Sequence, residues 1–310
     1  MHQIVECVMN VSEGRDTLKL ETIARKIEAV PSAFLLDHSA DPDHHRTVFS
    51  FIGTPSSIFD ASFAAVKKAG QLIDMREHQG VHPRIGAVDV VPFVPVQNVS
   101  MKECVAVAHR LGKKISQTLQ IPVYFYAEAA LSPDREHLSG IRKYQFEGLH
   151  EQIKSDPRSK PDLGPGCLHP SAGATAIGAR QPLIAFNIYL NTSDVGQARE
   201  IAGLIRESGG GLAGVKALGF YIERKGLAQV SMNVTRYRKT SLVKIFKRVQ
   251  KEARRLQTEP VSSEIIGLVP QDAINPRTIR TLHLENFHSG QILENRIAKV
   301  MNHASRLGGA

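Results

Sequence analysis

Apolar and polar residues recur along the chain with two periods, one typical of short strands and the other of amphipathic helices. In the first half, this pattern predicts strands at residues 3–9, 33–38, 46–53, 87–95 and 121–127, and helices at residues 17–29, 55–76 and 100–119. Pro55 suits the first turn of its helix, and Ser100 with Glu103 forms a capping-box pattern. The first six elements follow the order βαββαβ.

The second half of the chain repeats this order of elements. Strands are predicted at residues 183–190, 214–223, 228–235 and 261–268, and helices run from the capping residue Asp194 to about Ser208 and from Ser241 to Gln257. Two ferredoxin-like βαββαβ modules therefore make up the predicted fold, which is of the α+β class.

A boundary between the modules is expected near Arg180, which divides the chain into subdomains at residues 1–180 and 181–310. The glycine- and proline-rich stretch before it, residues 161–180, is too apolar for a solvated linker. We expect this stretch to be a loop that lines a cleft between the two subdomains, because functional loops and ligand sites are commonly built in this way.

The overall composition is that of an ordinary globular protein, with 42% hydrophobic and 22% charged residues among 310. It excludes a disordered or fibrous chain. No run approaches the ~18 apolar residues that a membrane span requires, and no signal-peptide pattern is visible at the N-terminus. Cys7, Cys104 and Cys167 are too few and too far apart for a disulfide framework. We therefore expect a soluble, cytoplasmic protein.

The 39 basic and 30 acidic residues give a net charge of +9, which favours an anionic partner such as nucleic acid, an acidic membrane or a polyanionic small molecule. Residues 236–255 hold nine of the basic residues. A solvated helix face is the preferred interpretation of this segment, because only Tyr237 and Phe246 interleave with its charges. The chain has no Trp and its strands lack a basic-aromatic signature, so nucleic acid is not the expected partner.

Histidines cluster first in residues 72–86. His78 and His82 are four apart, a spacing that on a helix would present two nitrogens to a metal ion. Gly80 and Pro83 instead predict a loop, so we expect no metal site here.

A loop histidine of this kind has two interpretations, general acid–base catalysis or a hydrogen bond that holds a turn. In the first, a neutral imidazole accepts a proton from an amine and returns it to a leaving nitrogen. The flanking arginines, Arg76 and Arg84, would lower the pKa of the ring and favour the free base. Spacing alone does not decide between the two.

A second cluster occupies residues 41–51, where the polar residues crowd one turn: Asp41, Asp43, His44 and His45. The aspartates are expected to cap backbone amides, as Asp commonly does in turns. Arg46 opens the following strand, where its guanidinium is placed to bind a carboxylate in bidentate fashion.

A third candidate is the glycine run in residues 207–219, where Gly209, Gly211 and Gly214 have the spacing G-x-G-x-x-G. This run ends a predicted helix and enters a strand, whereas a dinucleotide-binding fingerprint leaves a strand and opens a helix. We therefore expect no nucleotide site in this run.

Six longer segments occur in one order along the chain: VECVMNVSEGR, DPDHHRTVFSFIG, LIDMREHQGVHPRIGAVDVVPFVPV, PDLGPGCLHPSAGATAIGAR, LIAFNIYLNT and LAQVSMNVT. Together they closely resemble the formiminotransferase family, known from the bifunctional formimidoyltransferase–cyclodeaminase of histidine breakdown. The resemblance extends from residue 4 to about residue 300. Several long motifs in register are far more specific than any single short pattern.

The resemblance implies a homodimer of chains with two ferredoxin-like subdomains. It implies transfer of a formimidoyl group between N-formimidoyl-L-glutamate and tetrahydrofolate, the co-substrate. The family's catalytic histidine falls on the HPR motif, hence on His82, and its folate-binding segment falls on Gly164, Pro165, Gly166, Cys167, Leu168, His169, Pro170, Ser171, Ala172 and Gly173. No helical cyclodeaminase domain follows the matching region, so any deaminase is expected to be a separate chain.

Both implied substrates are anionic, since glutamate has two carboxylates and folate carries a tail of one or more glutamates. Arg46, Arg84 and Lys216 are the candidates for carboxylate contacts, and the net positive charge suits such ligands. Besides the disfavoured nucleic-acid binder, two alternatives stay open at this point. One is transfer of a formyl group on the same scaffold, and the other is a folate-binding protein without catalysis.

Overall fold

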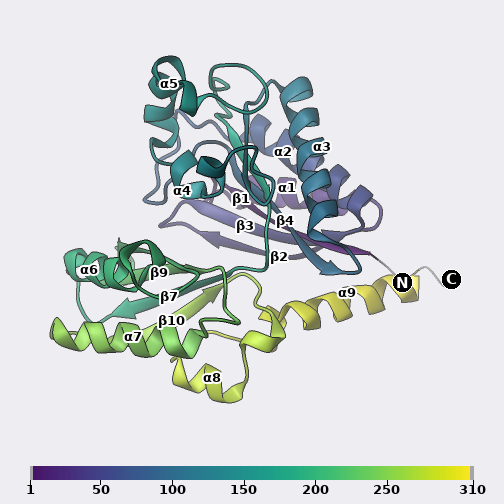
Figure 1. Ribbon diagram of the computed structural model, residues 1–310. Helices are drawn as coiled ribbons and strands as arrows, with labels where there is room; N and C mark the ends of the chain where they lie inside the picture. The colour runs from purple at the N-terminus through teal and green to yellow at the C-terminus, as the bar shows by residue number, and fades with distance from the viewer. Residues whose placement is uncertain (1–2, 308–310) are drawn as a thin grey trace. The chain divides into compact units, whose positions relative to one another are not determined.

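A computed structural model describes residues 3–307 of the chain (Figure 1). The residues up to Gln181 form one compact unit, and those from Pro182 onward form another. This division lies one residue from the boundary expected after Arg180. Each unit has its own sheet, helices and hydrophobic core, so the predicted α+β class is confirmed.

The first unit is built on a six-stranded sheet with the order β2-β3-β1-β4-β6-β5. Its strands are β1 (Ile4–Val11), β2 (Ala33–Asp41), β3 (Arg46–Gly53), β4 (Val88–Gln97), β5 (Val123–Ala127) and β6 (Thr175–Ala179). β1 lies antiparallel between β3 and β4, and β2 pairs antiparallel with β3. The first four strands thus have the order and connections of a βαββαβ module.

β6 corrects the sequence analysis, which assigned residues 161–180 to one loop. Thr175–Ala179 is instead a fully buried strand that runs parallel between β4 and β5. Its sequence, TAIGA, has small residues where buried parallel strands usually have branched ones, so the pattern does not indicate a strand. Gly178 is required because carbons of the Tyr126 ring lie 2.5 and 2.6 Å from the position that a Cβ would take.

The helices of the first unit cover both faces of its sheet (Figure 1). α1 (Thr17–Glu28), α2 (Pro55–Leu72) and α3 (Met101–Leu119) share one core with sheet residues such as Phe93. α4 (Leu138–Ile141) and α5 (Gln145–Ser155) pack on the other face, in a cluster that contains Val90 and Tyr126. The predicted capping box of α3 is confirmed, because Ser100 and Glu103 each accept the backbone amide of the other.

The second unit has a four-stranded antiparallel sheet with the order β10-β7-β9-β8. Its elements are β7 (Ile184–Leu190), α6 (Val195–Ile205), β8 (Val215–Ile222), β9 (Leu227–Val234), α7 (Leu242–Arg255) and β10 (Pro260–Ile266), followed by α8 (Pro276–Thr281) and α9 (Leu293–Leu307). The predicted second βαββαβ order is confirmed. α6 ends before the predicted Ser208 because the residues after it, Glu207–Gly209, form a 3₁₀ turn.

None of the helices within residues 3–307 is long and apolar enough to cross a lipid bilayer.

Replacement of Phe93 by Ala should destabilise the first unit, because the ring is fully buried in the core shared by the sheet and α1–α3. Truncation of a buried Phe costs about 3–5 kcal/mol. Urea unfolding followed by circular dichroism measures the loss. The control is Leu18→Ala on α1, where the side chain is 72% exposed, and it should change stability by less than about 0.5 kcal/mol. Equal losses in the two variants would contradict this packing.

Candidate active site

The loop between α2 and β4 holds the first histidine cluster. It spans residues 73–87 and contains no helix, because α2 ends at Leu72 and not at the predicted residue 76. His78 and His82 are therefore on a loop, as predicted, and lack the helical spacing that a shared metal ion requires. Within residues 3–307, no group of three or more His, Cys, Asp or Glu side chains is placed to hold a metal ion.

This loop reaches the end of the sheet at which β1 finishes and β3 and β4 begin. The register places Val11, the last residue of β1, opposite both Thr47 of β3 and Val88 of β4. The neighbouring residues Arg46 and Asp89 are thus at the same end of the sheet. Sequence alternation predicts each strand, but only their pairing brings these charged residues together.

His82 is held by one hydrogen bond on each ring nitrogen. Nδ1 lies 2.9 Å from the carbonyl oxygen of Pro83, and Nε2 lies 2.9 Å from Nη1 of Arg46. A carbonyl can only accept a hydrogen bond, and a guanidinium can only donate one. Nδ1 therefore carries the proton, and the lone pair of the neutral ring is on Nε2.

The surroundings of His82 keep its ring neutral. Burial lowers the pKa of His82 well below its usual value, and the positive charges of Arg46 and Arg142 lower it further. A neutral imidazole with an available lone pair is the form that a general base needs.

The arginines that flank His82 within this loop, Arg76 and Arg84, are not those that act most strongly on its ring. Arg76 is exposed at the surface. Arg84 is buried, and its N–H groups bond to both carboxylate oxygens of Glu147 at 2.6 and 2.7 Å, to the ring and carbonyl of His78, and to a glutamine amide. The structure thus gives Arg84 a structural role in place of the predicted substrate contact, because all five of its donors are used.

A network around His45 fixes the histidine loop. The rings of His45 and His78 stack with centroids 4.3 Å apart, and Nδ1 of His45 lies 2.7 Å from the carbonyl oxygen of Gln79. Nε2 of His45 lies 3.1 Å from a carboxylate oxygen of Glu13, which also accepts the amides of Gly14–Asp16. Glu13, which the sequence analysis missed, therefore ties the residues that follow β1 to this loop.

Asp41 organises the adjacent turn between β2 and β3. Its Oδ1 accepts the amides of Asp43 and His44, as predicted, and its Oδ2 lies 2.7 Å from Nδ1 of His44. Burial alone would raise the pKa of Asp41, but the hydrogen bonds and charge of His44 lower it to about 2. The ring of His44 in turn meets that of His82 edge-on, with centroids 6.1 Å apart.

Arg142 is a site residue that the sequence analysis missed. It follows α4 and forms an ion pair with Asp89, whose other carboxylate oxygen accepts the Ile85 amide at 2.9 Å. The side chains of Arg142 and Asp89 are 13% and 4% exposed. No motif or element is predicted for residues 128–160, so nothing in the sequence pattern places Arg142 beside His82.

The predicted folate-binding segment lies directly against the histidine loop. The amide of Met75 donates to the carbonyl of Ser171 at 2.8 Å, and the amide of Ala87 donates to the carbonyl of Ala172 at 2.9 Å. These bonds come from both ends of the loop that carries His82. Two motifs that are far apart in the sequence are thereby joined through their backbones.

The ten residues of this segment divide into anchors and exposed positions. Leu168, Ala172 and Gly173 are buried, Pro165, His169 and Ser171 are half-buried, and Gly164, Gly166, Cys167 and Pro170 are exposed. Nδ1 of His169 accepts the amide of Ala172 at 3.0 Å and closes the turn. The exposed positions are the ones that a ligand can reach.

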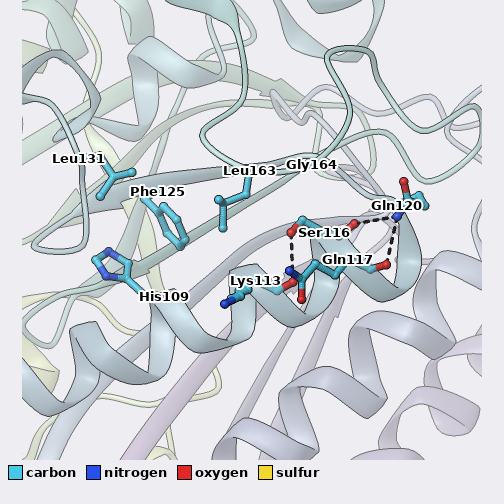
Figure 2. A pocket seen from close by; sticks show the side chains of 9 residues that line it. All are labelled: His109, Lys113, Ser116, Gln117, Gln120, Phe125, Leu131, Leu163 and Gly164. Atoms are coloured by element: carbon cyan, nitrogen blue, oxygen red, sulfur yellow. Dashed lines mark hydrogen bonds between the residues drawn. The ribbon is translucent and has the colours of Figure 1, made fainter.

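A pocket of about 660 Å³ opens where this segment begins (Figure 2). Lys113 and Gln117 of α3 line it together with the apolar side chains of Phe125 and Leu163. Gly164 also lines it and has a φ of +92°, a backbone conformation that favours glycine. The segment thus meets this pocket at one end and the histidine loop at the other.

Lys216, the remaining candidate for a carboxylate contact, has an exposed side chain on β8 of the second unit. On the same sheet, Glu264 accepts hydrogen bonds from Asn187 at 2.9 Å and from Tyr189 at 2.7 Å. No prediction from the sequence covers this cluster. Its signal is Asn187 inside the otherwise apolar strand pattern LIAFNIYL, together with the acidic Glu264 inside the predicted strand VSSEIIGL.

Comparison with known proteins identifies the family. The model of the formiminotransferase domain, N-terminal subdomain, matches residues 4–180, and the model of the formiminotransferase domain matches residues 185–301. The chain belongs to the formiminotransferase family. Membership makes it a transferase, as the names of its relatives also state.

Formiminotransferase relatives match over nearly the whole chain. It is 46% identical over 301 residues to the glutamate formimidoyltransferase of Thermoplasma acidophilum, which covers 96% of this chain and 99% of the relative. The glutamate formimidoyltransferase of Streptococcus pyogenes serotype M1 is 41% identical over 298 residues, with the same coverage. The formimidoyltransferase-cyclodeaminase of Mus musculus is 44% identical over 280 residues, which are 88% of this chain and 51% of the relative.

Gly173→Ala should destabilise the protein, because residue 173 has a φ of +69° and an added Cβ would lie 2.3 Å from the carbonyl oxygen of Ile85. Left-handed strain alone costs about 1–2 kcal/mol, so the midpoint of thermal unfolding should fall by at least about 2 °C. Gly166→Ala in the same segment is the matched control, since an added Cβ there meets no atom of the described residues within 4 Å. An unchanged midpoint for Gly173→Ala would refute the described turn.

The depressed pKa of His82 should make stability depend on pH. Between the usual pKa of His and the lower value in the folded state, the unfolded chain binds more protons, so stability falls as pH decreases from about 6.5. His82→Gln removes this contribution, which is at most about 1.4 kcal/mol per pH unit. Urea unfolding between pH 5 and 7 should therefore show a weaker decline for His82→Gln than for the wild type. Parallel declines would contradict the neutral state of the half-buried His82.

Proposed function

We propose that the protein is a glutamate formimidoyltransferase, which transfers a formimidoyl group between N-formimidoyl-L-glutamate and tetrahydrofolate with His82 as general base and acid. The observation that carries this proposal is the state of His82. Its ring is neutral, its lone pair is fixed on Nε2, and its loop is bonded to the segment expected to bind folate. The family and the names of the relatives supply the substrates.

The reaction needs one proton to be removed and one to be supplied. An amine nitrogen of tetrahydrofolate attacks the formimidoyl carbon, a new C–N bond forms, and Nε2 of His82 takes the proton that this nitrogen loses. The tetrahedral intermediate then collapses as the bond to the glutamate nitrogen breaks and His82 returns the proton to that nitrogen. The histidine ends in its initial state, and the products are 5-formimidoyltetrahydrofolate and L-glutamate. Such proton transfer contributes about 10²–10⁴-fold.

Tetrahydrofolate would bind along the segment from Gly164 to Gly173. Its exposed positions, with the glycines at 164 and 166, allow a planar ring to approach the backbone. Holding both substrates in one site makes the reaction effectively unimolecular, which is a further source of rate. A homodimer, a cytoplasmic location and a folate tail of several glutamates are parts of the same proposal.

His82→Gln should reduce turnover by about 10²–10⁴-fold and leave folate affinity nearly unchanged, because the ring moves protons but is not part of the folate segment. Purified protein is mixed with N-formimidoyl-L-glutamate and tetrahydrofolate, and acid treatment then cyclises the product to methenyl-tetrahydrofolate, which absorbs in the near ultraviolet. His150→Gln, an exposed histidine on α5, is the control and should keep wild-type turnover.

Near-normal turnover of a folded His82→Gln protein would remove the general-base role. A wild-type protein that binds tetrahydrofolate in calorimetry but gives no product would refute formimidoyl transfer. The formyl donor, N-formyl-L-glutamate, would then be the substrate to test.

A further inference from the structure

Arg46 and Arg142 place two positive charges near His82, and each has an N–H donor without a hydrogen-bond acceptor in the described part of the chain. The guanidinium of Arg46 makes one hydrogen bond among the described residues, from Nη1 to His82, and its Nε is buried without a partner. Arg142 bonds to Asp89, and within residues 3–307 its Nε is also buried without a partner. Unpaired buried donors are rare in proteins because each costs about 1–3 kcal/mol. A ligand that supplies hydrogen-bond acceptors beside Arg46 and Arg142 would explain both unpaired Nε donors.

The two guanidinium groups are close enough to repel each other. Burial lowers the pKa of Arg46 to about 10, and the neighbouring charge of Arg142 is the next largest cause. The nearby carboxylates neutralise the two positive charges only in part. Asp89 is paired with Arg142, and the oxygens of Asp41 bond to His44 and to backbone amides. An added anion would therefore be attracted by both arginines.

The hydrogen bond from Arg46 also occupies the lone pair of the proposed base, His82. Nη1 of Arg46 donates to Nε2 of His82, which is the nitrogen that must accept a proton from the substrate. Nδ1 is already protonated and bonded to Pro83. Both ring nitrogens of His82 are therefore occupied. The guanidinium of Arg46 must move away from Nε2 before this nitrogen can accept a proton from the substrate.

We propose that Arg46 and Arg142 together form a carboxylate-binding site, and that a bound carboxylate draws Arg46 away from Nε2 of His82 and so uncovers the base. The ligand class is a dicarboxylate with the length of glutamate, and this part rests on the proposed function. A carboxylate presents two coplanar oxygens, which match the paired donors of a guanidinium. Arg46, Arg142 and His82 are half-buried residues and so are not fully closed off from a ligand.

The bound anion has a second effect on His82. It would neutralise charges that now lower the pKa of the ring, so the pKa of His82 should rise when the site is filled. The charged and titratable groups around the ring are Arg46, Arg142, Asp41, Asp89 and His44. A pKa that moves toward neutral pH makes the histidine a better proton acceptor in the substrate complex than in the free protein.

The test uses glutarate, a dicarboxylate that lacks the amine and cannot react, so binding is measured without transfer. Isothermal calorimetry gives the affinity, and NMR of the His82 ring protons gives the pKa with and without glutarate. Glutaramide, the uncharged analogue, controls for shape. The variants are Arg142→Gln and Arg142→Lys, and the control is Arg76→Gln, an exposed arginine on the same loop.

We expect saturable binding of glutarate, no binding of glutaramide, and a rise in the pKa of His82 with glutarate. Loss of a charge-assisted bond should weaken glutarate binding at least about tenfold in Arg142→Gln. Arg142→Lys, which keeps the charge near Asp89 but loses the planar fork, should lie between Arg142→Gln and the wild type. Arg76→Gln should bind as the wild type does.

Equal glutarate affinity in Arg142→Gln and Arg76→Gln, with both proteins folded, would overturn the site. A pKa of His82 that stays constant or falls on binding would overturn the uncovering of the base. These results are distinct from a failure of the proposed function. A protein that transfers no formimidoyl group can still bind glutarate here, and an active enzyme with an unchanged KM for the donor in Arg142→Gln would refute this site alone.

Discussion

The hydrogen bond between Arg46 and His82 decides what the candidate active site can do, because it determines where the histidine keeps its proton. A guanidinium can only donate, so the nitrogen that faces Arg46 must hold the lone pair. The carbonyl of Pro83 on the opposite nitrogen imposes the same arrangement. Burial and positive charge then keep the ring neutral. The tautomer of His82, its protonation state and the position of its lone pair thus follow from two hydrogen bonds and their surroundings.

The rest of the first unit keeps these contacts in place. Arg84 uses all of its N–H donors in hydrogen bonds to Glu147, His78 and a glutamine. Glu13 links the residues after β1 to His45. Backbone bonds from both ends of the histidine loop reach the segment from Gly164 to Gly173. The loop has no helix or strand of its own, yet its position is determined by neighbours on several sides. Rigid support of this kind is what a catalytic side chain requires.

Local pattern was sufficient to predict most elements of the fold. β3 matches its predicted range of 46–53, and the capping box of α3 and the repeated βαββαβ order are confirmed. The prediction of a loop at residues 161–180 was wrong at β6. TAIGA consists largely of small residues, and its burial between two parallel strands depends on the tertiary fold. Periodicity reports how one segment is buried and says little about which segment lies beside it.

Candidate site residues could be predicted only where a motif indicated them. His82 and the segment expected to bind folate were predicted from the resemblance, and Arg46 from its place at the start of a strand. Arg142 is missed because its contact with Asp89 joins residues 53 apart in the sequence, in a region without periodic signal. Arg84 was a reasonable candidate by position, but Glu147, His78 and a glutamine together accept from all of its donors, and no local pattern reveals these partners.

The most direct test of this account is the tautomer of His82 in the free protein. Nitrogen-15 NMR of the histidine rings at pH 7, with His82→Gln used to assign the signal, distinguishes a protonated ring nitrogen from one with a lone pair. We expect the proton on Nδ1 and the lone pair on Nε2. A proton on Nε2, or on both nitrogens, would contradict the contacts with Arg46 and Pro83 and with them the general-base role of His82.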